Sequence, residues 1–126
     1  MPHLQFELSI AVAPEAARDF TTWATDRYAD VMETGTGHVA VTIRDEATVD
    51  MGRAGRDEPV ALLNADVRAG RSVDQREAYA MAVIDEFEAR WAIPPDNTYV
   101  IYTEHPGEDF LMAEGALDSW SASEGP

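Results

Sequence analysis

The segment VALLNADVRAGRSVDQ, residues 60–75, decides the fold of this chain. Residues 60–67 have the length and the apolar content of a strand. Ser72 and Gln75 have the spacing of a capping box, in which each side chain satisfies a free backbone N–H group of the other residue at the start of a helix. The segment therefore predicts a strand, a short turn and the first turn of a helix.

The residues that follow continue this pattern. Apolar residues recur at helical spacing, and they are Ala80, Val83, Ile84, Phe87 and Trp91. Pro94 and Pro95 stop the helix, because proline lacks the N–H group that a helix interior needs. Residues 98–104 are then expected to form a second strand, so this half of the chain predicts a β-α-β unit.

The first half of the chain predicts the same unit. In residues 4–10 the apolar side chains alternate with polar ones, as in a half-buried strand. Pro14 stands where a helix can begin, since its missing N–H costs nothing in a first turn. The apolar residues of that helix are Ala17, Phe20, Ala24, Tyr28 and Val31. Gly35 and Gly37 end it, and residues 38–43 are expected to form a strand.

The two halves are in register with each other. Adding 59 to a residue number of the first unit leads to its counterpart in the second unit, and the apolar phase is kept throughout. The pairs are Leu4 and Leu63, Phe6 and Ala65, Leu8 and Val67, Phe20 and Tyr79, Ala24 and Val83, Tyr28 and Phe87, and Val41 and Val100. The expected fold is therefore α+β, a four-stranded mixed sheet from a duplicated β-α-β unit with two helices on one face. The other sheet face needs a cover, so we expect self-association.

The length and composition predict a single domain over residues 1–126. It would consist of pseudo-repeats 2–46 and 60–117, a loop over residues 47–59 and a tail over residues 118–126, in which Trp120 indicates some docking. We expect no membrane span and a cytoplasmic protein, because neither a long apolar run nor a signal-like start is present. The absence of cysteine excludes disulfides, thiolate catalysis and cysteine-ligated metals.

The charge of the chain is strongly negative. It has 24 acidic residues against 9 basic ones, a net charge of −15, and no lysine. Nucleic acid would be repelled by such a surface, so that class of partner is set aside. Dense carboxylates keep a protein hydrated in concentrated salt, and the salt screens their mutual repulsion. The composition therefore predicts a halophilic protein, in which most carboxylates serve solvation.

Pro2 is the first candidate for chemistry. A small residue after Met1 normally allows the initiator to be removed, which would leave Pro2 with a free secondary amine. The pKa of an α-amino group lies near ~8 in water, and an apolar setting lowers it toward neutrality. An amine with a pKa near the working pH is suited to proton transfer. If Met1 were retained, the Pro2 nitrogen would be an amide and this chemistry would fail.

Residues 67–75 resemble the strand-to-helix turn of the tautomerase superfamily, whose members carry x-E-G-R-S-x-E-Q there. The resemblance continues without a gap through residues 98–104 and on to residues 106–110. The Met-Pro start is an independent element of it. The double-length chain is similar to the branches typified by macrophage migration inhibitory factor, cis-3-chloroacrylic acid dehalogenase and malonate semialdehyde decarboxylase. Those branches form trimers, so the resemblance implies a homotrimer.

The resemblance implies roles for individual residues. Pro2 matches the amino-terminal proline that acts as general base or acid. Arg71 matches the arginine that binds a substrate carboxylate, a task suited to a planar, permanently charged fork. Phe110 matches the aromatic residue that walls the pocket. Arg68 matches an arginine that the dehalogenase pattern carries three residues before the one matched by Arg71. Arg68 and Arg71 could bind one carboxylate together, or one could bind the carboxylate and the other a carbonyl.

Other positions depart from the pattern or stay open. Tyr99 stands where the short tautomerases have a second substrate arginine, and a phenol can hydrogen-bond an oxo or carboxylate group but supplies no charge. Glu114 is a weak candidate for activating water, and His38 for contacting the substrate near the pocket mouth. The offset of 59 between the repeats relates Pro2 to Ala61 and Arg71 to Val12, neither of which can take the same role. Each chain is therefore expected to contribute one active site, and a trimer would carry three.

Other clusters have simpler explanations. His3, His38 and His105 lack metal-ligand spacing, so we expect no metal and no cofactor. Residues 52–56 are rich in glycine but lack the lysine of a phosphate loop, which favours a flexible turn. Glu108 and Asp109 are expected to cap or solvate a loop.

The favoured function is a cofactor-independent tautomerase that shuttles a proton on a small 2-oxo or 2-hydroxy-enoate carboxylic acid. One alternative keeps the fold and changes the reaction: with a cationic Pro2, the protein would be a hydratase or dehalogenase of an unsaturated acid, or a decarboxylase of a 3-oxo acid. The pKa of Pro2 separates these readings, since a base needs a value near neutral and an acid a higher one. The other alternative is a trimeric binding module without catalysis.

Overall fold

The structure is a computed structural model that describes residues 1–116. Its main elements are β1 (Pro2–Leu8), α1 (Pro14–Met32), β2 (Ala40–Arg44), β3 (Ala61–Arg68), α2 (Val73–Trp91) and β4 (Thr98–His105). The short elements are the 3₁₀ turns η1 (Pro95–Asn97) and η2 (Gly107–Asp109) and the strands β5 (Leu111–Met112) and β6 (Gly115–Ala116). The expected tail over residues 118–126, with Trp120, lies outside the described residues.

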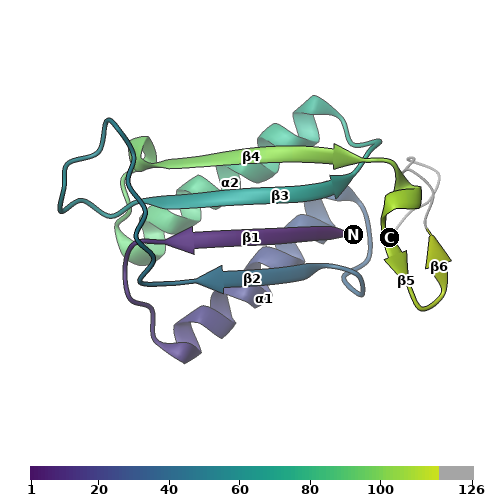
Figure 1. The fold of residues 1–126 in the computed structure, drawn as a ribbon, viewed down its shortest axis with the longest axis horizontal. Helices are drawn as coiled ribbons and strands as arrows, with labels where there is room; N and C mark the ends of the chain where they lie inside the picture. Colours follow the sequence, from purple (N-terminus) through teal and green to yellow (C-terminus); the bar gives the residue numbers. More distant parts are fainter. Residues whose placement is uncertain (117–126) are drawn as a thin grey trace.

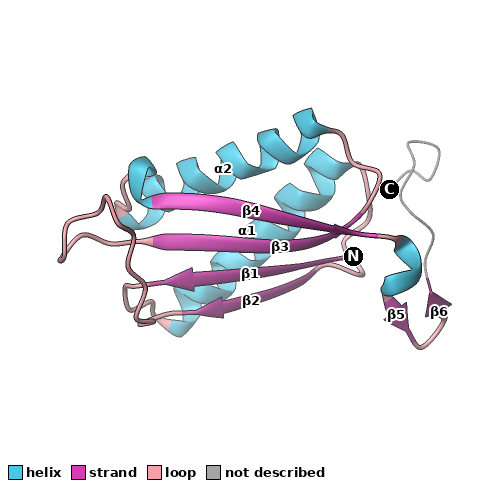
Figure 2. Cartoon of the chain, turned by 45° about the horizontal axis from the view of Figure 1, so that its top comes forward, coloured by secondary structure: helices cyan, strands magenta, loops and turns pink. Residues whose placement is uncertain are grey.

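The main sheet has the strand order β2-β1-β3-β4. β1 runs parallel to β2 and β3 runs parallel to β4, while the central pair β1 and β3 is antiparallel. Each parallel pair is joined through a helix, and α1 and α2 both cover the same face of the sheet (Figure 1, Figure 2). The predicted four-stranded mixed sheet with two helices on one face is confirmed.

The core lies between the sheet and the helices. The pairs that the offset of 59 predicts from the strands and helices are all at most 1% exposed, except Val41 and Val100, which pack against the core. Aromatic rings fill the centre of this layer: Phe20 stacks on Phe87 with ring centroids 5.1 Å apart, and Phe6 meets Phe20 edge to face at 4.9 Å. Such ring pairs add to the free energy gained from apolar burial. The apolar phase of the sequence therefore marks the buried side of each element.

The predicted helix ends are also present. Pro14 is the first residue of α1, and Ser72 caps α2 with both hydrogen bonds of the capping box in place. Each helix ends at a residue in the left-handed conformation, Glu33 after α1 and Ala92 after α2. The conformation stops the helix before Gly35 and before Pro94, the residues from which the ends were predicted.

The strand limits differ from the sequence expectation in the first unit. β1 covers Pro2–Leu8 rather than residues 4–10, because Pro2 pairs with Val67 while the chain turns away after Leu8. The Ile10 carbonyl instead accepts a hydrogen bond from the backbone N–H of Glu46 at 2.8 Å. Side-chain alternation continues past Leu8 in the sequence, so it could not show where the pairing stops.

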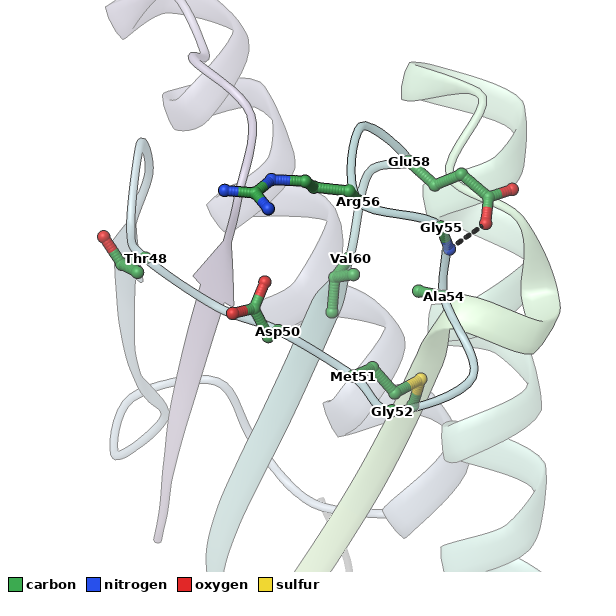
Figure 3. Close-up of a pocket in the computed structure, with 9 residues that line it drawn as sticks. All are labelled: Thr48, Asp50, Met51, Gly52, Ala54, Gly55, Arg56, Glu58 and Val60. Carbon is green, nitrogen blue, oxygen red and sulfur yellow. Dashed lines mark hydrogen bonds between the residues drawn. The ribbon is translucent and has the colours of Figure 1, made fainter.

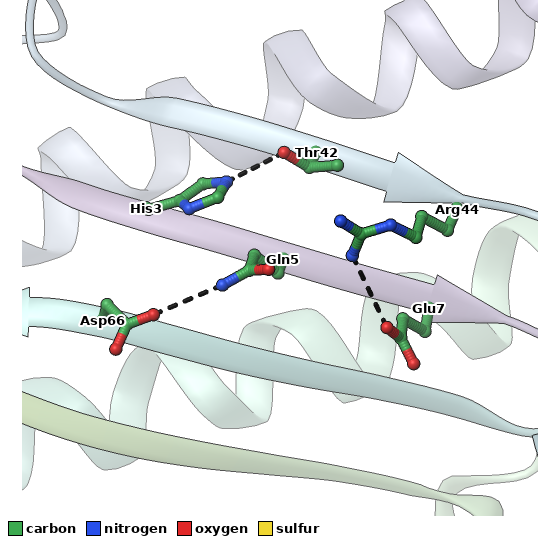
Figure 4. Close-up of polar contacts among 6 residues, drawn as sticks. All are labelled: His3, Gln5, Glu7, Thr42, Arg44 and Asp66. Carbon is green, nitrogen blue, oxygen red and sulfur yellow. Dashed lines mark hydrogen bonds and ion pairs between the residues drawn. The ribbon is translucent and has the colours of Figure 1, made fainter.

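The sheet face away from the helices is mainly polar. Figure 4 shows His3, Gln5, Glu7, Thr42, Arg44 and Asp66 projecting from this face. His3 Nε2 lies 2.8 Å from Thr42 Oγ1, Gln5 donates to Asp66 Oδ2 at 3.3 Å, and Arg44 pairs with Glu7 at 3.5 Å. Its exposed apolar side chains include Tyr99 and Ile101, 47% and 49% exposed. The expected uncovered apolar area is therefore clearest in the part of the face that β4 contributes.

Candidate functional site

One end of the sheet gathers most of the predicted site residues. β1 begins there with Pro2, which is buried and pairs with Val67. β3 and β4 end there, with Arg68 opposite His105. The antiparallel pairing of β1 and β3 places the first residue of one strand beside the last residues of the other, as the positions of β1, β3 and the N label in Figure 1 illustrate.

The turn between β3 and α2 carries the second predicted arginine. The backbone N–H of Ala69 donates to the carbonyl of His105 at 2.7 Å, which ties the turn to the end of β4. Gly70 has φ = 124°, a value that favours glycine because other residues clash there. Arg71 follows directly before the Ser72 cap of α2. A helix N-terminus carries partial positive charge, so Arg71 adds a full charge to a place that already attracts anions.

Both arginines of this turn are buried. Arg68 and Arg71 are each 5% exposed, although arginine side chains are almost never buried in proteins unless they are paired. Desolvating a cation costs free energy unless a counter-charge or hydrogen bonds compensate it. Two buried guanidinium groups therefore concentrate positive charge at this end of the sheet, in a chain whose net charge is −15.

Tyr28 lies near this cluster, although its spacing in the sequence predicts only a place in the apolar face of a helix. It lies one turn before the end of α1, is fully buried, and packs edge to face on Tyr79 with ring centroids 5.2 Å apart. Burial raises the pKa of Tyr28 to about 12, and the positive charges of Arg71 and then Arg68 oppose that rise. The one signal in the sequence was a hydroxyl at a position where the helix needs only an apolar side chain.

The segment after β4 returns to the same end. The ring of Phe110 meets the ring of His105 edge to face at 5.6 Å, so Phe110 lies beside the end of β4. The β5–β6 hairpin follows, and Glu114 in its turn has its Oε1 atom 3.7 Å from Nε2 of His38. His38 comes shortly before β2, which starts at this end of the sheet (Figure 1). Phe110, His38 and Glu114 thus lie around the end of the main sheet where β1 starts with Pro2.

His105 has an imidazole ring that a neighbouring carboxylate orients, a contact with no counterpart in the sequence pattern. Its Nε2 atom lies 2.9 Å from Asp66 Oδ1, and the other oxygen of that carboxylate accepts the hydrogen bond from Gln5. The carboxylate holds the imidazole in one orientation on the polar face of the sheet. Sequence alone does not pair residues 39 positions apart, so this contact became visible only in the structure.

Tyr99 is the predicted site residue that lies far from the Pro2 end of the sheet. It pairs with Leu62, which in turn pairs with Glu7, so Tyr99 is five residues along the sheet from Pro2. At about 3.3 Å per residue this separation is about 17 Å. Within one chain, Tyr99 cannot contact a ligand bound between Pro2 and Arg71.

A cavity of about 600 Å³ lies at the opposite end of the sheet, in the loop between β2 and β3 (Figure 3). Its lining comes from residues 48–60, with Val60 at the base and Asp50 and Arg56 among its charged groups. None of the predicted site residues lines it. Since it is open and distant from the buried arginines, we place the candidate site at the Pro2 end.

Within the described residues, no helix is long and apolar enough to cross a bilayer. No protein-family model matches the sequence, and no curated protein matches it either.

Solved structures share the fold. Macrophage migration inhibitory factor from Oncomelania hupensis is 15% identical with a TM-score of 0.81, over 94% of this chain and 84% of that one. N1, a member of the cis-3-chloroacrylic acid dehalogenase family, is 21% identical with a TM-score of 0.78, over 93% and 84%. Pt0534, solved after inactivation by 2-oxo-3-pentynoate, is 16% identical with a TM-score of 0.79, over 91% and 94%. At these identities the likeness is one of fold.

Proposed function

We propose that this chain, whose fold is that of the tautomerase superfamily, is a cofactor-independent isomerase that acts on a small 2-oxo or 2-hydroxy-enoate carboxylic acid. The observation that carries the proposal is the pair of buried arginines, Arg68 and Arg71, at the end of the sheet where Pro2 starts. A carboxylate is the ligand that a guanidinium fork binds best, and a secondary amine beside it can move a proton.

Each group has a role in this reaction. Arg71 binds the carboxylate, with Arg68 as its second cation. Pro2, freed of Met1, takes a proton from one atom of the ligand and returns it to another. Phe110 forms part of the pocket wall and keeps the amine in an apolar setting, which lowers the pKa of an amine. Positioning and one shuttling amine suffice for this chemistry, so no metal or cofactor is required.

The 2-oxo acid class has support from one related fold. Pt0534 is inactivated by 2-oxo-3-pentynoate, a small 2-oxo acid. We propose the same ligand class for this chain because its buried arginines suit the carboxylate of such an acid. His38 and Glu114 lie around the same end of the sheet, and we propose that they contact the far part of the ligand.

We propose a homotrimer as the working assembly, in a cytoplasm rich in salt. Support for self-association comes from Tyr99 and Ile101, which are exposed on the uncovered face of the sheet. In an assembly, Tyr99 of one copy could approach the candidate site of a neighbouring copy, although it lies too far from the site of its own chain. Since Ala61 and Val12 replace Pro2 and Arg71 in the other repeat, three sites per trimer are expected.

The test is ketonisation of phenylenolpyruvate and of 2-hydroxymuconate, followed by ultraviolet absorbance in molar KCl. Protein without Met1, confirmed by intact mass, is compared with Pro2→Ala. The proposal predicts a rate well above that of buffer and its collapse in Pro2→Ala. Equal rates for the two proteins, with the same oligomeric state, would exclude Pro2 as the base.

A second candidate reaction is supported by the contact between His38 and Glu114. A carboxylate beside a histidine at this end of the sheet can orient a water molecule. With a cationic Pro2, that water would add to an unsaturated acid, or Pro2 would assist decarboxylation. The pH profile separates the two candidates: activity that needs protonated Pro2 falls as the pH rises through its pKa, whereas activity that needs the free amine rises. Inactivity with halo-acrylates and malonate semialdehyde as well would leave the non-catalytic binding module.

A further inference from the structure

Tyr28 has a buried hydroxyl group that the described chain does not satisfy. No part of its surface is exposed, and its Oη atom makes no hydrogen bond to any residue in 1–116. By contrast, the hydroxyl of Tyr79 donates to the carbonyl of Ala24 at 3.0 Å, and that of Tyr102 donates to the carbonyl of Arg76 at 2.8 Å. Buried polar groups are nearly always hydrogen-bonded in proteins, so an exception needs a reason.

The Tyr28 ring is held firmly in its place. It packs edge to face on Tyr79, with an angle of 84° between the ring planes. The last turn of α1 is also bound to the first turn of α2, because the Gln75 side chain donates to the carbonyl of Val31 at 3.3 Å. The Tyr28 ring is therefore fixed near the place where the end of α1 meets the start of α2, and Arg71 lies close enough to act on it electrostatically.

The charges around Tyr28 suit a hydrogen-bond donor. Arg71 and Arg68 lie close enough to act on its hydroxyl electrostatically. Burial nevertheless keeps the pKa of Tyr28 at about 12, so the phenol stays protonated and neutral at physiological pH. A neutral donor beside two buried cations is suited to hydrogen-bond an anion that those cations attract.

We propose that Tyr28 is a catalytic residue that donates a hydrogen bond to the C2 oxygen of the substrate while negative charge develops there. This inference rests on the proposed isomerase function. The C2 oxygen is one carbon–carbon bond from the carboxylate, so a ligand held by Arg71 brings that oxygen next to the arginine cluster. Tyr99 was the sequence candidate for this role, but it lies at the other end of its own sheet.

The step balances without a co-reactant. The Pro2 nitrogen takes a proton from a ligand carbon, and the electron pair of the broken C–H bond forms a carbon–carbon double bond. The C2 carbonyl becomes an enolate oxygen, which accepts the hydrogen bond from Tyr28 while the phenol keeps its proton. Pro2 then returns its proton to another carbon, and the C2 carbonyl re-forms. In the ketonisation of phenylenolpyruvate the same enolate forms when Pro2 takes the proton of the C2 hydroxyl, and the proton is then added to the adjacent carbon. A hydrogen bond to the C2 oxygen that strengthens as negative charge develops there raises kcat more than it raises substrate affinity.

The experiment uses Tyr28→Phe, which removes only the hydroxyl, in full-length protein without Met1. Ketonisation of phenylenolpyruvate is measured together with thermal unfolding. We expect kcat to fall by ~100-fold to ~1000-fold, the effect of removing one donor to an oxyanion. The midpoint of unfolding should stay the same or rise, because an unsatisfied buried hydroxyl is removed. Tyr79→Phe is the matched control: it loses a formed hydrogen bond, so its midpoint should fall while kcat changes little.

Inhibition constants give a second test, because their ratio for two ligands would not change if Tyr28 had only a structural role. Pyruvate carries both the carboxylate and the C2 oxygen, whereas propanoate carries only the carboxylate. Tyr28→Phe should weaken inhibition by pyruvate and leave that by propanoate unchanged. Unchanged kcat, or equal weakening of both inhibitors, would overturn the role of Tyr28 while the isomerase function stands. A wild-type protein that ketonises neither substrate would instead overturn the proposed function, and this inference with it.

Discussion

The cap of α2 offers a direct test of how the fold positions Arg71. The Ser72 hydroxyl accepts a hydrogen bond from the backbone N–H of Gln75 at 3.0 Å, and the Gln75 side chain accepts one from the Ser72 N–H at 3.0 Å. Ser72→Ala removes the first bond. The expected loss is about 1 kcal/mol of the free energy of unfolding, in the middle of the range for N-caps, because Ser72 is exposed and water can replace the serine oxygen.

This loss should lower the midpoint of thermal unfolding by about 4 °C for a chain of this size. Circular dichroism at fixed protein concentration measures it, since an oligomer's midpoint depends on concentration. Ser72→Thr keeps the acceptor and is the control, with a smaller loss. A frayed first turn also lets the Arg71 backbone move, so kcat/KM should fall further in Ser72→Ala than in Tyr79→Phe, which acts away from this turn. Equal midpoints for the alanine and threonine variants would refute the capping argument, and an unchanged kcat/KM would refute its link to Arg71.

The free energy of unfolding should fall as the pH rises above 10. The pKa of Tyr28 is 10.0 in the unfolded chain and about 12 in the folded one. The contribution of Tyr28 to stability is therefore complete below pH 10 and is lost as the pH approaches 12. Urea unfolding across this window checks it, and Tyr28→Phe should reduce the slope; an equal slope in the variant would contradict the assignment. Raising KCl from about 0.1 M to about 2 M should raise the midpoint of unfolding, because salt screens the repulsion within a chain of net charge −15. A midpoint that stays constant or falls would remove the argument for a halophilic protein. Arg71→Gln keeps hydrogen-bond donors but loses the positive charge. We expect the Ki of propanoate to rise ~10-fold to ~100-fold, which corresponds to the free energy of a hydrogen bond to a charged group. An unchanged Ki would show that the carboxylate of the ligand does not bind at Arg71.

The order and type of the elements could be predicted from the sequence because they depend on local rules. The alternation of Leu4, Phe6 and Leu8 marks the inward side of β1, and the helical spacing of Tyr79, Val83 and Phe87 marks the inward side of α2. The capping box and Pro14 locate the helix starts through contacts within a few residues. Strand ends were less accurate, because the end of β1 depends on pairing with β3 rather than on its own residues.

The composition of the site depends on how the elements pack. Pro2, Arg68 and Arg71 could be selected from motifs, since each belongs to a short recognisable stretch. Tyr28 could not, because its hydroxyl comes within electrostatic range of Arg71 and Arg68 only when the end of α1 packs against the start of α2. Tyr99 was selected from a single aligned position, and only the antiparallel pairing of β1 with β3 shows that it lies at the far end of the sheet. The sequence by itself determined the elements and the chemically active residue types through short-range periodicity and capping. The tertiary structure decided which of those residues lie together at one end of the sheet, because contacts between elements distant in the chain follow from strand direction and helix packing.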